Sequence, residues 1–356
     1  MSKRDLFAVF MEVGEQNTQP GGRLGMINLP SWMFLSSFES LRRHIIDNTT
    51  ILSLLHIGRG IFGSDFGTVA FSVRNAEYKN QNAIYRRLFE RHVEVESIEA
   101  KKRKFFDTSY GYYNTQQSDF KEIPEASIAY WASEKVIDIF RYTDRLGSIA
   151  DARQGMSTTD NNKFLRAWYE PSNSKFGVGM SRTEAAESGC RWFPYNKGGP
   201  YRKWYGNNVF VVNWEDDGQE LKDLSSSALR NKDYYFQTGL TWTAITAGDF
   251  SMRYVPKGYL FDTKGPMLFP HDRENMNYIL GFTNSKAAHH FFTILAPTLD
   301  FSQGPLSDQP IKRSEAVKGK VDKRVDSCQE ISSQDWNSRE TSWDFTQHPL
   351  IQQNAA

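Results

Sequence analysis

The stretch Ile27-Asn-Leu-Pro-Ser-Trp-Met-Phe-Leu-Ser-Ser-Phe-Glu-Ser-Leu-Arg42 decides the fold class. It begins inside an apolar run, residues 25–29, that predicts a buried strand, and Pro30 then predicts a tight turn. Residues 36–46 begin with serine and place apolar side chains at helical spacing, which predicts a helix with a serine cap. A strand, a turn and a helix in this order are typical of an α/β domain.

The sequence around this stretch continues the alternation of helices and strands. Residues 5–13 place apolar side chains at helical spacing and predict a short amphipathic helix. Residues 51–57 and 68–73 predict two further strands, which could pair as an antiparallel hairpin. The first part of the chain is therefore predicted to be an α/β sheet, which we interpret as the distal half of a doubly wound domain.

Residues 79–125 differ in composition from the sheet region before them. Lysine and arginine side chains are interleaved with glutamates, which favours a solvated helical face over a track for phosphates. Residues 107–119 combine three tyrosines with Ser, Thr and Gln and predict a surface loop.

A second stretch, Arg153-Gln-Gly-Met-Ser-Thr-Thr-Asp-Asn-Asn-Lys-Phe-Leu-Arg-Ala-Trp-Tyr169, is polar and leads into an aromatic-rich region. Residues 190–270 hold short aromatic and β-branched runs between Gly, Pro and Asn residues, which predicts a mostly β region with irregular loops. Residues 275–295 predict a pair of helices.

These patterns divide the chain into three predicted parts. Residues 1–128 form the α/β part with its charged insertion, and residues 129–312 form a mixed α+β, β-rich domain. Residues 313–356 are polar, with alternating charges and a few spaced aromatics, and predict a linker.

The composition bounds the class of protein. The 356 residues are 39% hydrophobic and 24% charged, which is enough for two domains of ordinary size. The formal net charge is only +1, so a nucleic-acid surface would have to be a local basic face. No apolar run approaches the roughly 18 residues that span a bilayer, and we expect a cytoplasmic protein without membrane contact.

The sequence lacks the motifs typical of metal sites and of hydrolases. Cys190 and Cys328 are too few for a disulfide framework or a four-cysteine metal site. The histidines include the adjacent pair His289-His290 but no H-E-x-x-H motif, so no metal site is predicted. The sequence contains no G-x-S-x-G elbow of a hydrolase.

The stretch Gly58-Arg-Gly-Ile-Phe-Gly63 matches the G-x-G-x-x-G pattern of nucleotide-binding turns. Such a turn needs a helix directly after it, because the helix N-terminus binds the phosphate. A predicted strand follows here, so a simple connection between two strands is favoured.

The stretch Trp192-Phe-Pro-Tyr-Asn-Lys-Gly-Gly-Pro-Tyr-Arg-Lys-Trp-Tyr205 mixes cations with aromatic side chains around a flexible Gly-Gly-Pro sequence. Cations beside such a loop suit phosphate contact, and the aromatics could pack along sugar or base. A β-hairpin with exposed basic residues is an equally good interpretation of the composition.

The three quoted long stretches together resemble the adenine-specific DNA methyltransferases of BREX phage-exclusion systems. The resemblance begins at Ser2 and runs nearly to the end of the chain, but it covers only a middle to C-terminal slice of that larger family. It implies that residues 1–128 are the last part of an S-adenosylmethionine-dependent methyltransferase domain and that residues 129–312 are its target-recognition domain. The family reaction transfers a methyl group from S-adenosylmethionine to N6 of an adenine extruded from duplex DNA.

The resemblance also implies which functional parts this slice contains. In the family, the cofactor-binding glycine loop and the catalytic Asn-Pro-Pro-Tyr loop precede the region that matches this chain, so we expect the chain alone to be inactive. Asn28-Leu-Pro-Ser-Trp32 has the loose shape of that catalytic loop but lacks its first proline, and packing is favoured for Trp32. Phe62 matches by position a phenylalanine that stacks on the extruded base, although burial in the core is an equally good interpretation.

The implied partners are double-stranded DNA, the N-terminal half of the methyltransferase as a separate chain, and other proteins of the phage-defence system. The resemblance places the Trp192 stretch in the target-recognition region. The candidate DNA-binding residues are Gln154, Thr158, Asn161, Lys197, Tyr201, Arg202, Lys203 and Trp204.

Two other classes of function compete with this interpretation. The first is a stand-alone DNA-recognition module that resembles a type I restriction specificity subunit, and the second is a protein whose aromatic loop binds sugar or peptide. A contiguous basic face around Arg202 would favour DNA binding. An exposed sheet edge would favour the methyltransferase over the stand-alone module, because it marks where further strands belong.

Overall fold

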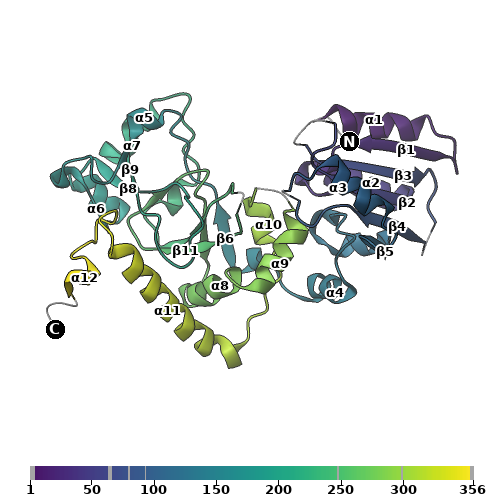
Figure 1. The fold of residues 1–356 in the computed structure, drawn as a ribbon. Coiled ribbons are helices and arrows are strands. Elements are labelled where there is room, and N and C mark those ends of the chain that lie inside the picture. The colour runs from purple at the N-terminus through teal and green to yellow at the C-terminus, as the bar shows by residue number, and fades with distance from the viewer. Residues whose placement is uncertain are drawn as a thin grey trace. The chain divides into compact units, whose positions relative to one another are not determined.

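The computed structural model describes residues 5–62, 66–78, 81–92, 94–246, 248–297 and 300–352 (Figure 1). The chain divides into two compact units. Unit 1 comprises residues 1–144 and 293–298, and unit 2 comprises residues 145–292 and 299–356. The architecture is mixed α/β with several sheets.

Unit 1 contains a five-stranded sheet in the order β1-β3-β2-β4-β5. Its strands are β1 (Arg23–Asn28), β2 (Thr50–Gly58), β3 (Thr68–Arg74), β4 (Asn82–Arg87) and β5 (Tyr112–Gln116). β3 pairs antiparallel with both β1 and β2, whereas β2 and β4 are parallel, so β1, β2 and β4 run in one direction. The predicted antiparallel hairpin of the second and third strands is confirmed.

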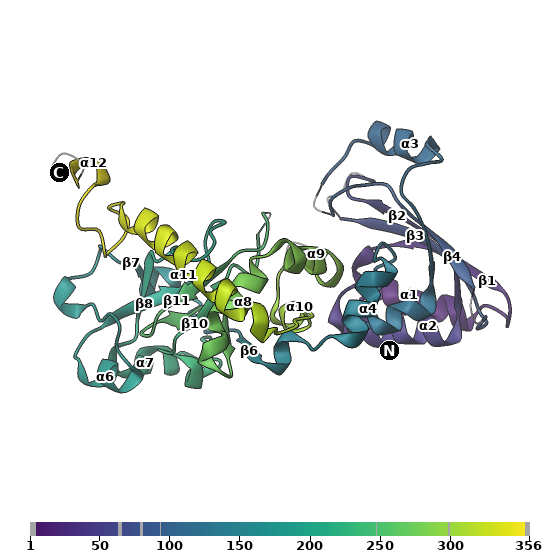
Figure 2. The same cartoon turned by 90° about the horizontal axis from the view of Figure 1, so that it is seen from below.

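One face of this sheet is covered by helices, as Figure 2 shows for α1, α2 and α4. The helices of unit 1 are α1 (Leu6–Gln16), α2 (Glu39–Asn48), α3 (Ile98–Phe106) and α4 (Glu134–Tyr142). Alternate residues of the strands, such as Leu54, Phe71 and Tyr85, are buried on the covered face. Ile27 and Ile84, which face the other side, are 59% and 57% exposed.

Several predictions for unit 1 are corrected by the structure. The predicted serine cap of α2 is wrong, because Phe38 is its N-cap and Ser36 begins a short 3-10 turn instead. Residues 79–125 are not mainly a helical face, since they contain β4 and β5 as well as α3. The charged Arg86 is accommodated in β4 because its guanidinium group stacks on Tyr112 and donates to the carbonyls of Lys104 and Asp107. The predicted surface loop at 107–119 likewise contains a strand.

Unit 2 contains two four-stranded sheets, in the orders β11-β10-β13-β6 and β12-β8-β9-β7. Their strands are β6 (Ala150–Arg153), β7 (Leu165–Ala167), β8 (Trp192–Asn196), β9 (Phe210–Asn213), β10 (Gly239–Trp242), β11 (Met252–Val255), β12 (Leu260–Phe261) and β13 (Met267–Pro270). The two sheets share one core, to which β8, β9, β11 and β13 all contribute buried side chains. The prediction of a mostly β region with irregular loops is confirmed.

The remaining helices include the predicted pair at 275–295 and several that were not predicted. They are α5 (Asn161–Phe164), α6 (Arg182–Glu187), α7 (Glu215–Lys222), α8 (Met276–Thr283), α9 (Lys286–Leu295), α10 (Gln303–Ser307), α11 (Glu315–Asn337) and α12 (Pro349–Gln352). The longest helix that was not predicted is α11, which lies in the segment expected to be a linker. It packs on α8, where a Cβ on Gly281 would lie 2.9 Å from Val325 and 3.0 Å from Val321. Across the described part of the chain, no helix combines the length and apolar character needed to cross a bilayer.

Candidate nucleic-acid interface

The loop between β8 and β9 carries most of the predicted DNA-binding residues. β8 and β9 pair antiparallel, so this stretch is a hairpin with a long connection. Gly198 and Gly199 have φ values of 83° and 142°, which suit glycine, and a Cβ on Gly199 would lie 2.8 Å from Nδ2 of Asn207. The connection therefore depends on both glycines for its path.

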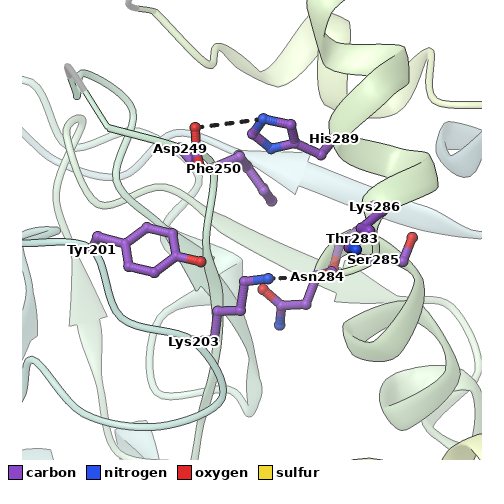
Figure 3. Close-up of a pocket in the computed structure, with 9 residues that line it drawn as sticks. All are labelled: Tyr201, Lys203, Asp249, Phe250, Thr283, Asn284, Ser285, Lys286 and His289. Carbon is purple, nitrogen blue, oxygen red and sulfur yellow. Dashed lines mark hydrogen bonds and ion pairs between the residues drawn. The ribbon is translucent and has the colours of Figure 1, made fainter.

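Tyr201 and Lys203 from this loop line an open polar pocket of about 200 Å³ (Figure 3). The opposite wall comes from the end of α8, the start of α9 and the segment before β11. The full lining is Tyr201, Lys203, Asp249, Phe250, Thr283, Asn284, Ser285, Lys286 and His289. The pocket lies within unit 2, and all the parts of the chain that form it are described.

The lining of the pocket includes two lysines and one carboxylate. Nζ of Lys203 donates to the carbonyl of Asn284 at 2.8 Å, which holds this cation at the wall of the pocket (Figure 3). Lys286 is exposed at the first turn of α9, whose Ser285 hydroxyl accepts from the amide of Ala288. Asp249 is the carboxylate of the lining, and it lies 3.5 Å from Nε2 of His289. Lys286 in the first turn of α9 and Lys203 of the β8–β9 loop together suit an anion such as a phosphate.

Thr158, Asn161 and Lys197 meet in a second cluster. Oδ1 of Asn161 accepts from Oγ1 of Thr158 at 3.0 Å and from Nζ of Lys197 at 2.8 Å. Nζ of Lys197 also lies 3.5 Å from the buried carboxylate of Asp262, which accepts from the Tyr195 hydroxyl at 2.9 Å. This acceptor raises the pKa of Tyr195 further, although burial is the main cause.

The other predicted residues of unit 2 are engaged within the protein. Oε1 of Gln154 accepts from Arg230 at 2.8 Å, and Arg202 forms an ion pair of 2.7 Å with Asp335 of α11. Trp204 has a φ of 73° and forms a bridge to Arg253 of β11. The structure thus brings Tyr201 and Lys203 together in the pocket, and it places Arg202 and Gln154 in contacts outside it.

In unit 1, the aromatic residues of the two predicted turns have opposite environments. Trp32 is fully buried, and its indole Nε1 donates to Oδ1 of Asn28, so the prediction of packing for Trp32 is confirmed. Phe62 is 75% exposed and has a φ of 58° in the connection between β2 and β3. The connection between two strands predicted at Gly58 is confirmed, and Gly63 lies outside the described residues.

Sequence analysis did not identify Asp262, Asp249 or His289 as parts of the candidate interface. Asp262 lies between β12 and β13, far along the chain from Lys197, and no local pattern connects the two residues. The pair His289-His290 was considered only as a metal site. Among the described residues, no group of histidine, cysteine and carboxylate side chains could hold a metal ion.

Comparison with known proteins identifies relatives of this chain. A family model described as Eco57I restriction-modification methylase matches residues 1–62. The adenine-specific methyltransferase PglX of Lacticaseibacillus casei (strain Zhang) is 37% identical over 98% of this chain. The predicted resemblance is confirmed: this chain is a relative of PglX. The adenine-specific methyltransferase BrxX of Escherichia coli O9:H4 (strain HS) is also 37% identical, over 99% of this chain.

The chain spans only 30% of PglX and 28% of BrxX. The Type IIL restriction-modification enzyme MmeI, solved in complex with DNA, is similar in structure, with a TM-score of 0.56 and 10% identity. That similarity covers 96% of this chain and 46% of MmeI. At this level of identity, the similarity to MmeI shows that the fold is shared.

Methyltransferases in general use S-adenosylmethionine, and the glycine-rich turn of unit 1 has the sequence pattern of a nucleotide-binding turn. A Cβ on Gly58 would lie 2.5 Å from the Phe89 ring, and one on Gly60 would lie 2.6 Å from the Glu96 carbonyl. Both glycines therefore lie against protein atoms and not against open space. The residues of this turn therefore do not fit the cofactor.

Proposed function

We propose that this chain is part of an adenine-specific DNA methyltransferase of a phage-defence system and supplies its target recognition. The observation that carries the proposal is the 37% identity to PglX and BrxX over nearly the whole chain. In this proposal, residues 1–128 are the last part of the catalytic domain, and residues 129–312 recognise the DNA target. The methyl donor of the complete enzyme is S-adenosylmethionine.

The proposed contact with DNA is made by unit 2. Lys203 and Lys286 line the same pocket, and the one carboxylate of that lining faces His289. This arrangement favours a backbone phosphate, and the neighbouring Tyr201 ring, which is 54% exposed, is available to a sugar or a base. Lys197, Asn161 and Thr158 form a second proposed contact, in which the hydrogen-bonded cluster fixes the cation. Arg202, Trp204 and Gln154 then support the loop rather than contact DNA directly.

Unit 1 supports the methyltransferase over a stand-alone recognition module. In the described part of the sheet, β1 is an edge strand that pairs with β3 alone. β1 runs in the same direction as β2 and β4, and Ile27 on it is 59% exposed. An apolar edge strand of this kind is suited to pairing with a further parallel strand. We propose that the preceding part of the methyltransferase completes a doubly wound sheet there and brings the catalytic and cofactor loops.

Phe62 is the proposed base-stacking residue of unit 1. Its ring is exposed, and the positive φ holds it in a turn between two strands. An exposed aromatic platform offsets the stacking that an adenine loses when it leaves the duplex. The chain alone is proposed to bind DNA without methylating it.

DNA binding by unit 2 is tested with the chain itself and a fluorescent duplex at several salt concentrations. We expect salt-dependent binding, and the variant Lys203→Ala/Lys286→Ala should bind more weakly. Its slope of log affinity against log salt should be smaller by about 2, since each phosphate contact contributes about 0.9. Lys121→Ala in unit 1, which removes a surface lysine paired with Asp47, is the matched control. A double variant that keeps the slope of the unmodified chain would contradict the assignment of the pocket.

A further inference from the structure

The C-terminal half of α11 holds the DNA-binding loop of unit 2 through Arg202. Nη2 of Arg202 donates to the carbonyl of Ser332 at 3.0 Å and to Oδ2 of Asp335 at 2.7 Å. Its guanidinium carbon lies 5.2 Å from the centre of the Trp336 ring, and its Nε donates to the Tyr205 carbonyl at 2.8 Å. One arginine of the loop is thus held by three residues within two turns of α11.

Ser332 also binds the main chain of the loop directly. Its hydroxyl lies 3.0 Å from the carbonyl oxygens of both Lys203 and Tyr205, on either side of Trp204. Gly206 permits this close approach. It has a φ of 115°, and a Cβ there would lie 2.5 Å from Nε of Arg202 and 2.9 Å from Cε3 of Trp336. The contact between α11 and the loop therefore requires glycine at position 206.

β11 holds the same segment from its other side. The amide of Trp204 donates to the Met252 carbonyl at 2.9 Å, and the amide of Tyr254 donates to the Trp204 carbonyl at 2.8 Å. Nη1 of the fully buried Arg253 donates to the Arg202 carbonyl at 3.3 Å. A tryptophan with a φ of 73° is uncommon and persists only where its surroundings fix the backbone. Residues 202–206 are fixed in this way between β11 and α11.

We propose that Ser332, Asp335 and Trp336, here called the α11 clamp, position the loop so that Lys203 and Tyr201 face the DNA. Ser332 and Asp335 are then positioning residues of the recognition unit. This inference rests on the proposed function of the pocket, because it assigns the clamp to the same DNA contact. It also gives the segment after residue 312 a role in recognition.

Electrostatics and positioning make opposite predictions for Asp335. A carboxylate near a DNA-binding loop repels phosphate, so its removal by itself should tighten binding. If the clamp positions Lys203, its removal should weaken binding despite the lost negative charge. The ion pair with Arg202 also lowers the pKa of Asp335, so the carboxylate is charged when DNA binds.

The test compares Ser332→Ala/Asp335→Asn with Glu330→Gln, which removes the same charge from an exposed position of α11. The clamp variant should bind duplex DNA about fivefold more weakly, which is the upper end of what an exposed ion pair contributes. Glu330→Gln should bind as tightly as the unmodified chain or slightly more tightly. Because the clamp positions both Lys203 and Tyr201, the loss should be clearly smaller than fivefold when Lys203 is already alanine. Tighter binding by the clamp variant, or an equal loss in the Lys203→Ala background, would overturn the proposal.

Hydrogen exchange tests the clamp without DNA. The amides of Trp204 and Tyr254 bond the loop to β11, so they should exchange at least tenfold faster in the clamp variant than in Glu330→Gln. Unchanged exchange would show that α11 does not hold the loop. If the unmodified chain fails to bind DNA while the exchange result is as expected, the proposed function fails and the structural role of the clamp stands.

Discussion

At the scale of single residues, the residues that a side chain contacts are set by tertiary packing. Local sequence indicates what kind of contact a side chain can make, but not which residue it contacts. Trp32 was correctly predicted to pack, because the stretch around it lacks the proline that would fix a catalytic loop. Lys203 was correctly identified as a loop cation, but its neighbour Arg202 is held by Asp335, which lies 133 positions away. Such a contact follows from tertiary packing and leaves no periodic signal in the sequence.

The buried histidines of unit 1 provide a residue-scale prediction about pH. Burial, together with the nearby Arg87, lowers the pKa of His92 from 6.5 to about 3, and Nε2 of His92 is buried without a partner. Burial, followed by the charges of His92, Arg87 and Lys101, also lowers the pKa of His56 well below 6.5. The unfolded chain takes up these protons as the pH falls through about 6.5, whereas the folded chain does not, so stability is lost on acidification.

The expected loss between pH 7.5 and pH 5.5 is about 1.4 kcal/mol for each histidine, from the usual histidine pKa of about 6.5. Urea titrations at the two pH values measure it. His92→Gln should remove about half of the pH dependence contributed by the pair. Equal free energies of unfolding at both pH values would show that these rings do not remain neutral in the folded protein.

At the scale of elements, helices and strands were predicted correctly where the apolar pattern was strong. They were missed where charged residues interrupt that pattern. β1, β2 and β3 were found from their apolar runs. β4 was missed because Arg86 and Arg87 end it, and their guanidinium groups are accommodated by the rings of Tyr112 and Tyr113. α11 was missed because it buries few apolar side chains. Val325 is its only buried residue. Its packing depends on Gly281 of α8, which sequence alone cannot connect to it.

The turn between β12 and β13 provides an element-scale prediction. A Cβ on Gly265 would lie 2.5 Å from the Gly198 amide nitrogen and 2.6 Å from the Asn196 carbonyl oxygen. Both atoms are backbone, so Gly265→Ala should displace the Gly-Gly loop and destabilise unit 2 by about 1–3 kcal/mol. Gly319→Ala within α11, where a Cβ meets nothing within 4 Å, is the control and should be neutral or slightly stabilising. Thermal unfolding of both variants measures the difference, and equal midpoints would contradict the close packing of the two turns.

At the scale of the whole molecule, composition and pattern correctly predicted a mixed α/β chain with a β-rich second region. The division into compact units falls after Asp144, and the helix–strand alternation of the first half is present in unit 1. The edge position of β1 could not be read from its sequence, because pairing partners follow from topology and not from local pattern. The same holds for the exposed face that carries Ile27 and Ile84.

That edge leads to a prediction about assembly. Ile27→Lys should change the stability of this chain by no more than about 0.5 kcal/mol, because the side chain is 59% exposed. It should weaken association with a polypeptide carrying the preceding part of the methyltransferase at least tenfold. Ile331→Lys, at an isoleucine of α11 that is 67% exposed, is the matched control. Sedimentation of mixtures measures the association, and equal affinities for both variants would place the partner elsewhere.

The most direct test of the account is a methyl-transfer assay on DNA that lacks N6-methyladenine, with labelled S-adenosylmethionine. The chain is assayed alone and then mixed with a polypeptide carrying the part of a related methyltransferase that precedes the region matched by this chain. We expect label in adenine only from the mixture, and we expect that label to be lost when this chain carries Lys203→Ala/Lys286→Ala. Methylation by the chain alone would contradict the account, and so would a mixture that binds DNA but transfers no methyl group.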